Sequence, residues 1–376
     1  MTSRERLRVA MELGVPDRVP FMCQLSIGHM LLQLGVSPVE FWNDAEVFAR
    51  GLADLRARYD FDGVLVSLHG HDLEWRKNIR TRTWSREGEL VECNDGTRLL
   101  CPPDELPQPL ATGARHHPVP ADVSSTGLPD TLSYIPVSQG LRFAIHPDYR
   151  FEVFRMVRRF VGRDFAIHGE VASPFDYFLD FFGHEQALMY LIDNPMQSKH
   201  ILAHFATLVA QLASAMCKED IDAVKISSPF AGAGFISLNF YREFVLPYER
   251  QIALAVRQEG KHVYTHTCGH IGDRLEAMFE AGVSGIECLD PPPIGNVDLE
   301  EAKARTRGKG FLKGNVDSVR LLTAREDEIL SDARRRVEVG KKGGGFIFST
   351  ACSVAPRVEP HKLFILREAV EQWGRP

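Results

Sequence analysis

The order of segments along the chain limits its fold more than any other feature. Short apolar or β-branched runs alternate with longer amphipathic stretches, several of which end at glycine, as helices commonly do. Eight of these runs are expected to be strands: 18–24, 62–69, 164–170, 222–228, 262–268, 284–290, 310–316 and 344–352. Eight strand–helix units at this spacing predict parallel strands closed into an α/β barrel, the (β/α)8 or TIM barrel. Because this architecture often uses more than 200 residues as one domain, we expect residues 1–376 to form a single domain.

Residues 70–150 interrupt the regular alternation. They contain the stretch "RTRTWSREGELVECNDGTRLLC", whose alternating pattern and Asn-Asp-Gly turn predict a β-hairpin, and a proline-rich connector follows. We interpret this region as an insertion after the second strand. An insertion there would overhang the C-terminal face of the barrel, where active sites of this fold lie, and would act as a lid or a docking surface.

Charge and cysteine content exclude several classes of protein. A formal net charge of -6 argues against nucleic acid or an anionic membrane as the main partner. The charged N-terminus lacks a secretory apolar segment and no later run is apolar enough to span a bilayer, so we predict a cytoplasmic protein. Seven cysteines, an odd number, are then interpreted as reduced thiols. Five of them are expected to be ordinary small buried residues: Cys23, Cys93, Cys101, Cys217 and Cys288.

Two expected strands end in residues that bind metals. In "HVYTHTC" residues two apart share a face, so Tyr264, His266 and Cys268 point the same way, with the last two at the C-terminal end. In the eighth strand, Phe346, Phe348, Thr350 and Cys352 are expected to share a face, with Cys352 at the tip. If both faces are the barrel interior, an imidazole and two thiols meet at its mouth.

One imidazole and two thiolates form a zinc-type ligand set. Three protein ligands with an open fourth position are typical of catalytic zinc, whereas structural zinc sites are closed by four ligands. The sequence leaves an alternative open, in which His266 is a core histidine and Cys268 and Cys352 are buried thiols.

The chain resembles the uroporphyrinogen decarboxylase superfamily over nearly its full length. The resemblance is carried by "RERLRVAMELGVPDRVP", "FISLNFYREFVLPYERQIALAVRQEGKHVYTHTCG", "GFLKGNVDS" and "GGFIFSTACSVAPRVEPHKL", and it is weakest in residues 70–150. The decarboxylases carry an arginine-rich N-terminal segment and a histidine in the last-strand motif. Here "FMCQLSIGH" has no arginine, and Cys352 stands where that histidine would be. The zinc-dependent methyltransferase branch instead carries H-x-C and a later cysteine, which His266, Cys268 and Cys352 match.

That branch includes methylcobalamin:coenzyme M methyltransferases and the methyltransferase components of O-demethylase systems. The resemblance therefore implies a zinc-dependent methyltransferase that moves a methyl group between a corrinoid (cobalamin) and a zinc-activated thiol, or a methyl ether or phenol. The D-x-H-x-x-G signature of cobalamin-binding domains does not occur in the chain, so a separate corrinoid protein is the expected partner. The family also makes a homodimer plausible.

Other polar residues end the expected strands. Glu170 is our candidate for a displaceable fourth ligand or a catalytic base, and helix capping or ion pairing is the alternative. Residues expected to bind substrate, or to support the ligands, are His69, His71, Asp72, Tyr264, Asp290 and Asn315. Loop capping would explain Asp290 and Asn315 as well, and the sequence does not assign Lys225 and Ser227 to a face.

Two other functions remain open alongside methyl transfer. One is a metal-free decarboxylase that acts on another acid, and the other is a non-catalytic zinc-binding or ligand-binding barrel. Within methyl transfer the direction is undecided. A pocket lined by aromatics from the insertion would favour an aryl methyl ether, whereas a narrow basic pocket would favour an anionic thiol or a folate.

Overall fold

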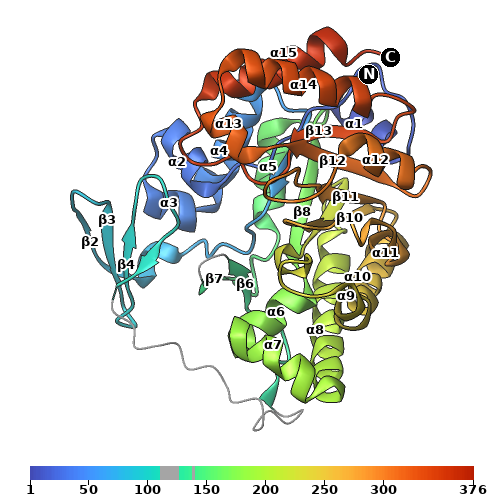
Figure 1. Cartoon of the computed structure of the whole chain (residues 1–376). Coiled ribbons are helices and arrows are strands. Elements are labelled where there is room, and N and C mark those ends of the chain that lie inside the picture. The colour runs from blue at the N-terminus through green and yellow to red at the C-terminus, as the bar shows by residue number, and fades with distance from the viewer. Residues whose placement is uncertain (111–126, 138–139) are drawn as a thin grey trace.

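The computed structural model describes residues 1–110, 127–137 and 140–376, and its centre is a parallel sheet of seven strands (Figure 1). The strands, in spatial order, are β1 (Gly63–Val66), β8 (Ala166–Ala172), β9 (Ala223–Ser227), β10 (His262–Thr267), β11 (Gly285–Cys288), β12 (Phe311–Val316) and β13 (Phe346–Thr350). Each overlaps one of the last seven strands expected from the sequence. The α/β class and the parallel order are therefore confirmed, and they agree with a TIM-barrel-like fold.

The first expected strand, 18–24, does not form a regular strand. Two isolated parallel bridges, Phe21 with Phe348 and Leu25 with Val354, join it to the region of β13. On the other side, the Asp62 N–H donates to the Phe21 carbonyl at 2.8 Å, just before β1. Pro20 has no N–H to donate, which helps to explain why the ladder is interrupted here. The segment is still hydrogen-bonded to both edges of the seven-stranded sheet.

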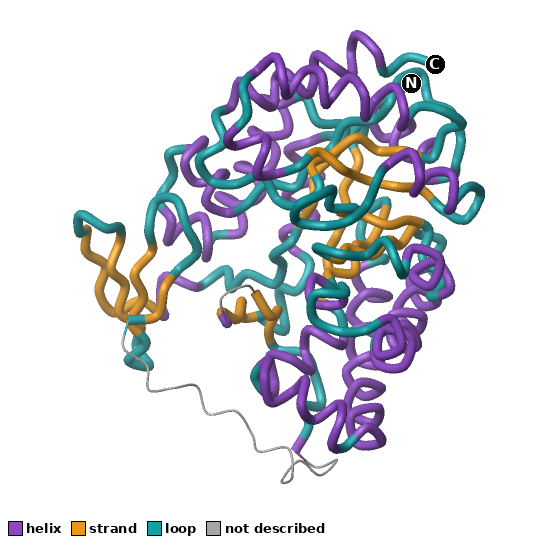
Figure 2. Tube along the Cα trace, viewed as in Figure 1, coloured by secondary structure: helices purple, strands orange, loops and turns teal. Residues whose placement is uncertain are grey.

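Helices cover the outside of the sheet, as Figure 2 shows. The larger ones are α1 (Ser3–Met11), α4 (Ala45–Tyr59), α5 (Glu152–Val161), α8 (Pro195–Met216), α10 (Leu246–Gln258), α14 (Glu326–Gly340) and α15 (Pro360–Trp373). Shorter ones are α2 (Ile27–Leu34), α3 (Pro38–Asn43), α6 (Pro174–Phe182), α7 (His184–Asp193), α9 (Leu238–Phe244), α11 (Leu275–Glu280), α12 (Leu299–Arg305) and α13 (Ser318–Thr323). Among the described residues, no helix combines the length and apolar character needed to cross a membrane.

The core has an inner and an outer part. The inner cluster joins Leu7 of α1 to one residue from most strands, including Tyr264 and Ile347. The larger cluster lies between the sheet and the helices and contains Phe346 and Phe348. The expected parity of the eighth strand was therefore wrong: its two phenylalanines pack outward, Phe346 near Gly340 of α14, and Ile347 points inward.

Residues 70–150 form smaller sheets between β1 and β8. Strands β2 (Ile79–Trp84), β3 (Glu89–Cys93), β4 (Arg98–Cys101) and β5 (Gln108–Pro109) are antiparallel, and β6 (Tyr134–Val137) pairs with β7 (Leu141–Ala144). The expected hairpin is confirmed, since β3 and β4 flank the Asn-Asp-Gly turn. In Figure 1 the four-stranded sheet stands apart from the central sheet. Parts of the predicted insertion, 111–126 and 138–139, lie outside the described residues, and its origin and lid function stay predictions.

Candidate metal and substrate site

A cavity of about 430 Å³ lies at the C-terminal ends of the central strands. Side chains from strands β8, β9 and β10 and from the loops after β10 and β13 reach it: Glu170, Lys225, His266, Cys268 and Cys352. Leu106 and Val137, from the region between β1 and β8, form part of its wall. The expected meeting of residues from distant strands in one cavity is thus observed.

Three potential metal ligands gather at one side of this cavity. The Nε2 atom of His266 lies 3.2 Å from the Sγ atom of Cys268, which lies 3.9 Å from the Sγ atom of Cys352. All three ligand atoms are within 4.8 Å of one another. Cys352 reaches the group because the chain turns after β13, and its backbone N–H donates to the Ser318 hydroxyl oxygen at 3.2 Å.

These separations fit a tetrahedral zinc ion. Zinc–sulfur bonds of about 2.3 Å and zinc–nitrogen bonds of about 2.0 Å place two thiolates about 3.8 Å apart and an imidazole nitrogen about 3.5 Å from a thiolate. The observed values differ from these by a few tenths of an ångström at most. The second nitrogen of His266, Nδ1, is 2.9 Å from the Glu287 carboxylate, which leaves Nε2 for a metal.

Glu287 is a site residue that the sequence analysis missed. It pairs in register with His266 on the neighbouring strand, and both faces of its strand are buried. Its carboxylate lies 2.5 Å from the Lys313 ammonium and 3.5 Å from that of Lys225. Burial alone would raise the pKa of Glu287, but the two lysines and His266 hold it well below its usual range. A single carboxylate in the apolar run "SGIECLD" was the available signal.

Of the two candidate thiol ligands, Cys268 is the one that ionises more readily. Hydrogen bonds from Cys288 and Cys352 lower the pKa of Cys268, and His266 lowers it further. Burial acts in the opposite direction. The same hydrogen bond and burial raise the pKa of Cys352. Burial would lower the pKa of His266, but the Cys268 thiolate and Glu287 raise it to about 9. A metal that binds here must therefore displace protons.

Cys288 and Asp290 lie next to the Cys268 thiol. The three ligand atoms of Cys268, Cys288 and Asp290 are within 4.8 Å of one another. The Cys288 thiol donates to the Asp290 carboxylate at 3.1 Å, and the Gly269 N–H donates to the same oxygen at 2.7 Å. Asp290 thus holds the loop after β10, whereas the capping alternative had assigned it to the loop after its own strand, and its role in substrate binding stays a prediction. Interpreting Cys288 as an ordinary buried residue overlooked this contact.

Glu170 lines the cavity, as expected, but belongs to neither ligand group found among the described residues. Its Oε1 atom is 3.3 Å from the Lys225 ammonium, and its buried Oε2 atom has no hydrogen-bond partner within the described part of the chain. Asp176 of α6 also lines the cavity, and burial raises its pKa well above the usual range. A catalytic role for Glu170 stays a prediction.

The three residues of "HGHD" lie outside the described lining of this cavity, and their role in substrate binding stays a prediction. His69 and His71 are buried against aromatic rings, including Phe154 and Phe143, and burial lowers their pKa values to about 4 and about 3. Asp72 accepts from the Glu74 N–H at 2.8 Å and so caps the following turn.

Tyr264 and Asn315 also lie outside the described lining of the cavity. Tyr264 is fully buried in the inner core, where its hydroxyl lies 3.0 Å from the His168 ring. Its side chain points inward as predicted. It lies two residues before His266, farther from the C-terminal end of β10, and does not line the described cavity. Asn315 is buried as well, donates to the Leu289 carbonyl at 2.9 Å and accepts from Arg336. Both residues support the strands that carry the site.

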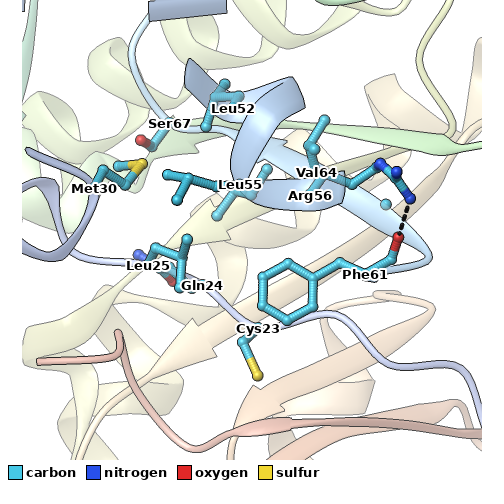
Figure 3. Close-up of a pocket in the computed structure, with 12 residues that line it drawn as sticks. Cys23, Gln24, Leu25, Met30, Leu52, Leu55, Arg56, Phe61, Val64 and Ser67 are labelled. Carbon is cyan, nitrogen blue, oxygen red and sulfur yellow. Dashed lines mark hydrogen bonds between the residues drawn. The ribbon is translucent and has the colours of Figure 1, made fainter. Parts of the chain in front are cut away.

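A second, smaller pocket borders the site cavity and is drawn in Figure 3. It shares Gln24, Leu25 and Ser67 with the site cavity but has a volume of only about 30 Å³. That space suits about two water molecules. Cys23 lines it, and burial raises the pKa of its thiol to about 11, in agreement with an unreactive buried residue. The larger cavity is therefore the candidate for substrate.

Comparison with known proteins gives three main likenesses. The family model "Uroporphyrinogen decarboxylase (URO-D)" matches residues 135–373, more than half of the chain. A uroporphyrinogen decarboxylase of Thioalkalivibrio sulfidiphilus is 29% identical over 187 residues, 49% of this chain and 51% of the relative. The methylcobamide:CoM methyltransferase MtbA of Methanosarcina acetivorans is 25% identical over 195 residues, 50% of this chain and 53% of the relative. The chain thus spans about half the length of these curated relatives.

A solved structure extends the likeness of fold to the full length. A methyltransferase from Methanosarcina mazei superimposes with a TM-score of 0.73 at 18% sequence identity, and the match covers 99% of each chain. At this identity the comparison establishes a common fold.

Proposed function

Because the chain belongs to the uroporphyrinogen decarboxylase family and resembles its corrinoid methyltransferase branch, we propose that it is a zinc-dependent methyltransferase. It would move a methyl group between a small thiol, or a methyl ether or phenol, and a corrinoid carried by a separate protein. The observation that carries the proposal is the ligand triplet His266, Cys268 and Cys352 at the edge of a substrate-sized cavity.

When bound, zinc would supply the Lewis acid that stabilises a thiolate or activates an ether oxygen. The chain's own residues would hold this site. Glu287 fixes the orientation of His266 through Nδ1, and Ser318 supports the backbone of Cys352. Lys225 and Lys313 keep Glu287 charged, so that it remains an acceptor.

The remaining wall of the cavity suits the transfer of an apolar methyl group. Leu25, Ile27, Leu68, Leu106 and Val137 line it. Such side chains exclude water from the reacting group, and water exclusion strengthens every electrostatic interaction in the site. Glu170 faces the same space and is proposed as the residue that accepts or returns a proton of the substrate.

Decarboxylation of another acid is the second candidate, because several curated relatives carry that name. The described lining contains no arginine that would hold a substrate carboxylate, and this favours methyl transfer. A binding barrel without catalysis is the third candidate. An open position beside three ligands argues for catalysis, since structural zinc sites are usually closed.

The proposal is tested with zinc-loaded full-length protein, methylcobalamin and 2-mercaptoethanol. Loss of the methyl–cobalt bond changes the corrinoid absorbance, and mass spectrometry identifies the methyl thioether. We expect turnover by the wild type and by Cys93→Ser, a control thiol on β3, and loss of turnover in Cys268→Ser. Turnover that is equal in all three proteins would contradict the role of the triplet.

A further inference from the structure

The cavity wall carries an excess of carboxylates. Four acidic residues line it from three parts of the chain: Glu105 after β4, Glu170 on β8, and Asp176 and Asp180 on α6. Asp176 contributes less charge than the others, since burial favours its neutral form. An anion that enters meets acidic groups on several sides.

Lys225 is the one lysine or arginine among the described lining residues, and oxygen atoms surround its ammonium group. The Lys225 ammonium has three oxygen neighbours, one for each N–H: Gln24 at 2.6 Å, Glu170 at 3.3 Å and Glu287 at 3.5 Å. His184 packs its ring on Phe230 with centroids 4.7 Å apart. Arg142 does not line the cavity, and its guanidinium group pairs with the Asp180 carboxylate at 2.6 Å. Among the described lining residues, no unpaired ammonium or guanidinium group is left for a substrate anion.

Hydrogen bonding leads to the same conclusion. Glu170 lines this cavity, and its buried Oε2 atom has no hydrogen-bond partner in the described chain. A carboxylate oxygen only accepts hydrogen bonds. A sulfonate or carboxylate on the substrate would also only accept, whereas a hydroxyl or an ammonium group would donate to Glu170.

We propose that the cavity takes a substrate whose polar end is neutral or cationic and that it excludes anionic substrates. This inference rests on the proposed function, because it concerns the methyl donor or acceptor at the same site. It separates this chain from enzymes that act on sulfonated thiols or on polycarboxylates. Like-charge repulsion across a partly desolvated cavity of this size corresponds to about a tenfold difference in affinity.

Three thiols of one backbone test the proposal by calorimetry on zinc-loaded full-length protein: 2-mercaptoethanol, 2-mercaptoethanesulfonate and thiocholine, which are neutral, anionic and cationic. The first two have thiols of similar acidity and are compared directly. We expect 2-mercaptoethanol to bind about tenfold more tightly than the sulfonate. Zinc-free protein gives the background for each probe.

A variant then assigns the effect to the wall. Glu105→Gln should tighten binding of the sulfonate several-fold, weaken binding of thiocholine and leave 2-mercaptoethanol unchanged. Glu371→Gln, at the exposed end of α15, is the control and should change none of the three. Comparing each probe with itself removes differences in thiol acidity.

The outcomes separate the two claims. Zinc-dependent binding in which the sulfonate equals or exceeds 2-mercaptoethanol would overturn the charge preference and leave methyl transfer standing. Unchanged affinities in Glu105→Gln would likewise overturn it. If none of the thiols binds in a zinc-dependent manner, the proposed function fails and this inference falls with it.

Discussion

The thiol sulfurs of Cys268 and Cys352, 84 positions apart in the chain, lie 3.9 Å from each other. Cys268 follows β10 and Cys352 follows β13, so the fold brings together the ends of two strands that are not neighbours in the sheet. The spacing is close to that of two thiolates on one zinc ion, about 3.8 Å. The imidazole of His266 completes the group.

Glu287→Gln should weaken zinc binding by about 10- to 100-fold, because a neutral amide orients and polarises His266 less than a carboxylate does. Competition with a chelator of known affinity measures the change. Glu301→Gln, on the exposed side of α12, should bind zinc as the wild type does. An unchanged affinity in Glu287→Gln would mean that the contact with His266 does not support the metal.

Cys352→Ala should abolish tight zinc binding while the protein stays folded, because the ligands join strand ends in a chain that already has a large core. Circular dichroism and urea unfolding compare the variant with the wild type after zinc has been removed from both. We expect similar spectra and a single cooperative transition with the same dependence on urea. A variant that has lost cooperative unfolding would show that the metal organises the fold.

Glu249 on α10 should make the stability depend on pH. Burial raises its pKa to about 7, against the opposing effect of Ser228 and Thr265. The folded protein therefore holds this proton more tightly than the unfolded chain does. The stabilisation is fully present below the unfolded pKa, near 4.5, and is lost as the pH rises through 7.

Urea unfolding between pH 5 and 8 tests this effect with Glu249→Gln. Over that range the wild type should lose about 3 kcal/mol of unfolding free energy relative to the variant. Parallel pH profiles for the two proteins would show that Glu249 does not titrate in this way.

Asp62 should be important for stability because it ties the 18–24 segment to β1. Its fully buried carboxylate accepts from Arg6 at 2.6 Å, Arg18 at 2.8 Å and the Phe21 N–H at 2.7 Å. Asp62→Asn leaves these donors poorly matched and should cost about 3 kcal/mol of unfolding free energy. Asp60→Asn is the control, since asparagine tolerates the left-handed conformation at this position. Equal stabilities would contradict the role of Asp62.

Most of the fold could be predicted from the sequence because buried strands of a parallel sheet leave continuous apolar runs. Seven of the eight expected strands are present, and the first one, 18–24, which contains Pro20, is reduced to two bridges. Burial on both faces of the strand also explains the error in β13. When both faces of a strand are buried, alternation does not indicate which face points inward, so Phe346 and Phe348 were assigned to the wrong side.

The gathering of the three candidate ligands could be predicted from the sequence, but their surroundings could not. His266, Cys268 and Cys352 were named from residue type, strand position and the resemblance to the zinc-dependent methyltransferase branch. The roles of Glu287 and Lys225 depend on which residues face each other across neighbouring strands, and one sequence does not give that register. His69 and His71 were chosen for their residue type, yet both are directed into apolar surroundings.

Elemental analysis of metal bound to the purified protein tests the central claim most directly. The wild type and Cys93→Ser should each hold about one zinc per chain, and Cys268→Ser should hold almost none. A wild type that holds no zinc and takes up none on reconstitution, or a Cys268→Ser variant with a full complement of zinc, would contradict the account.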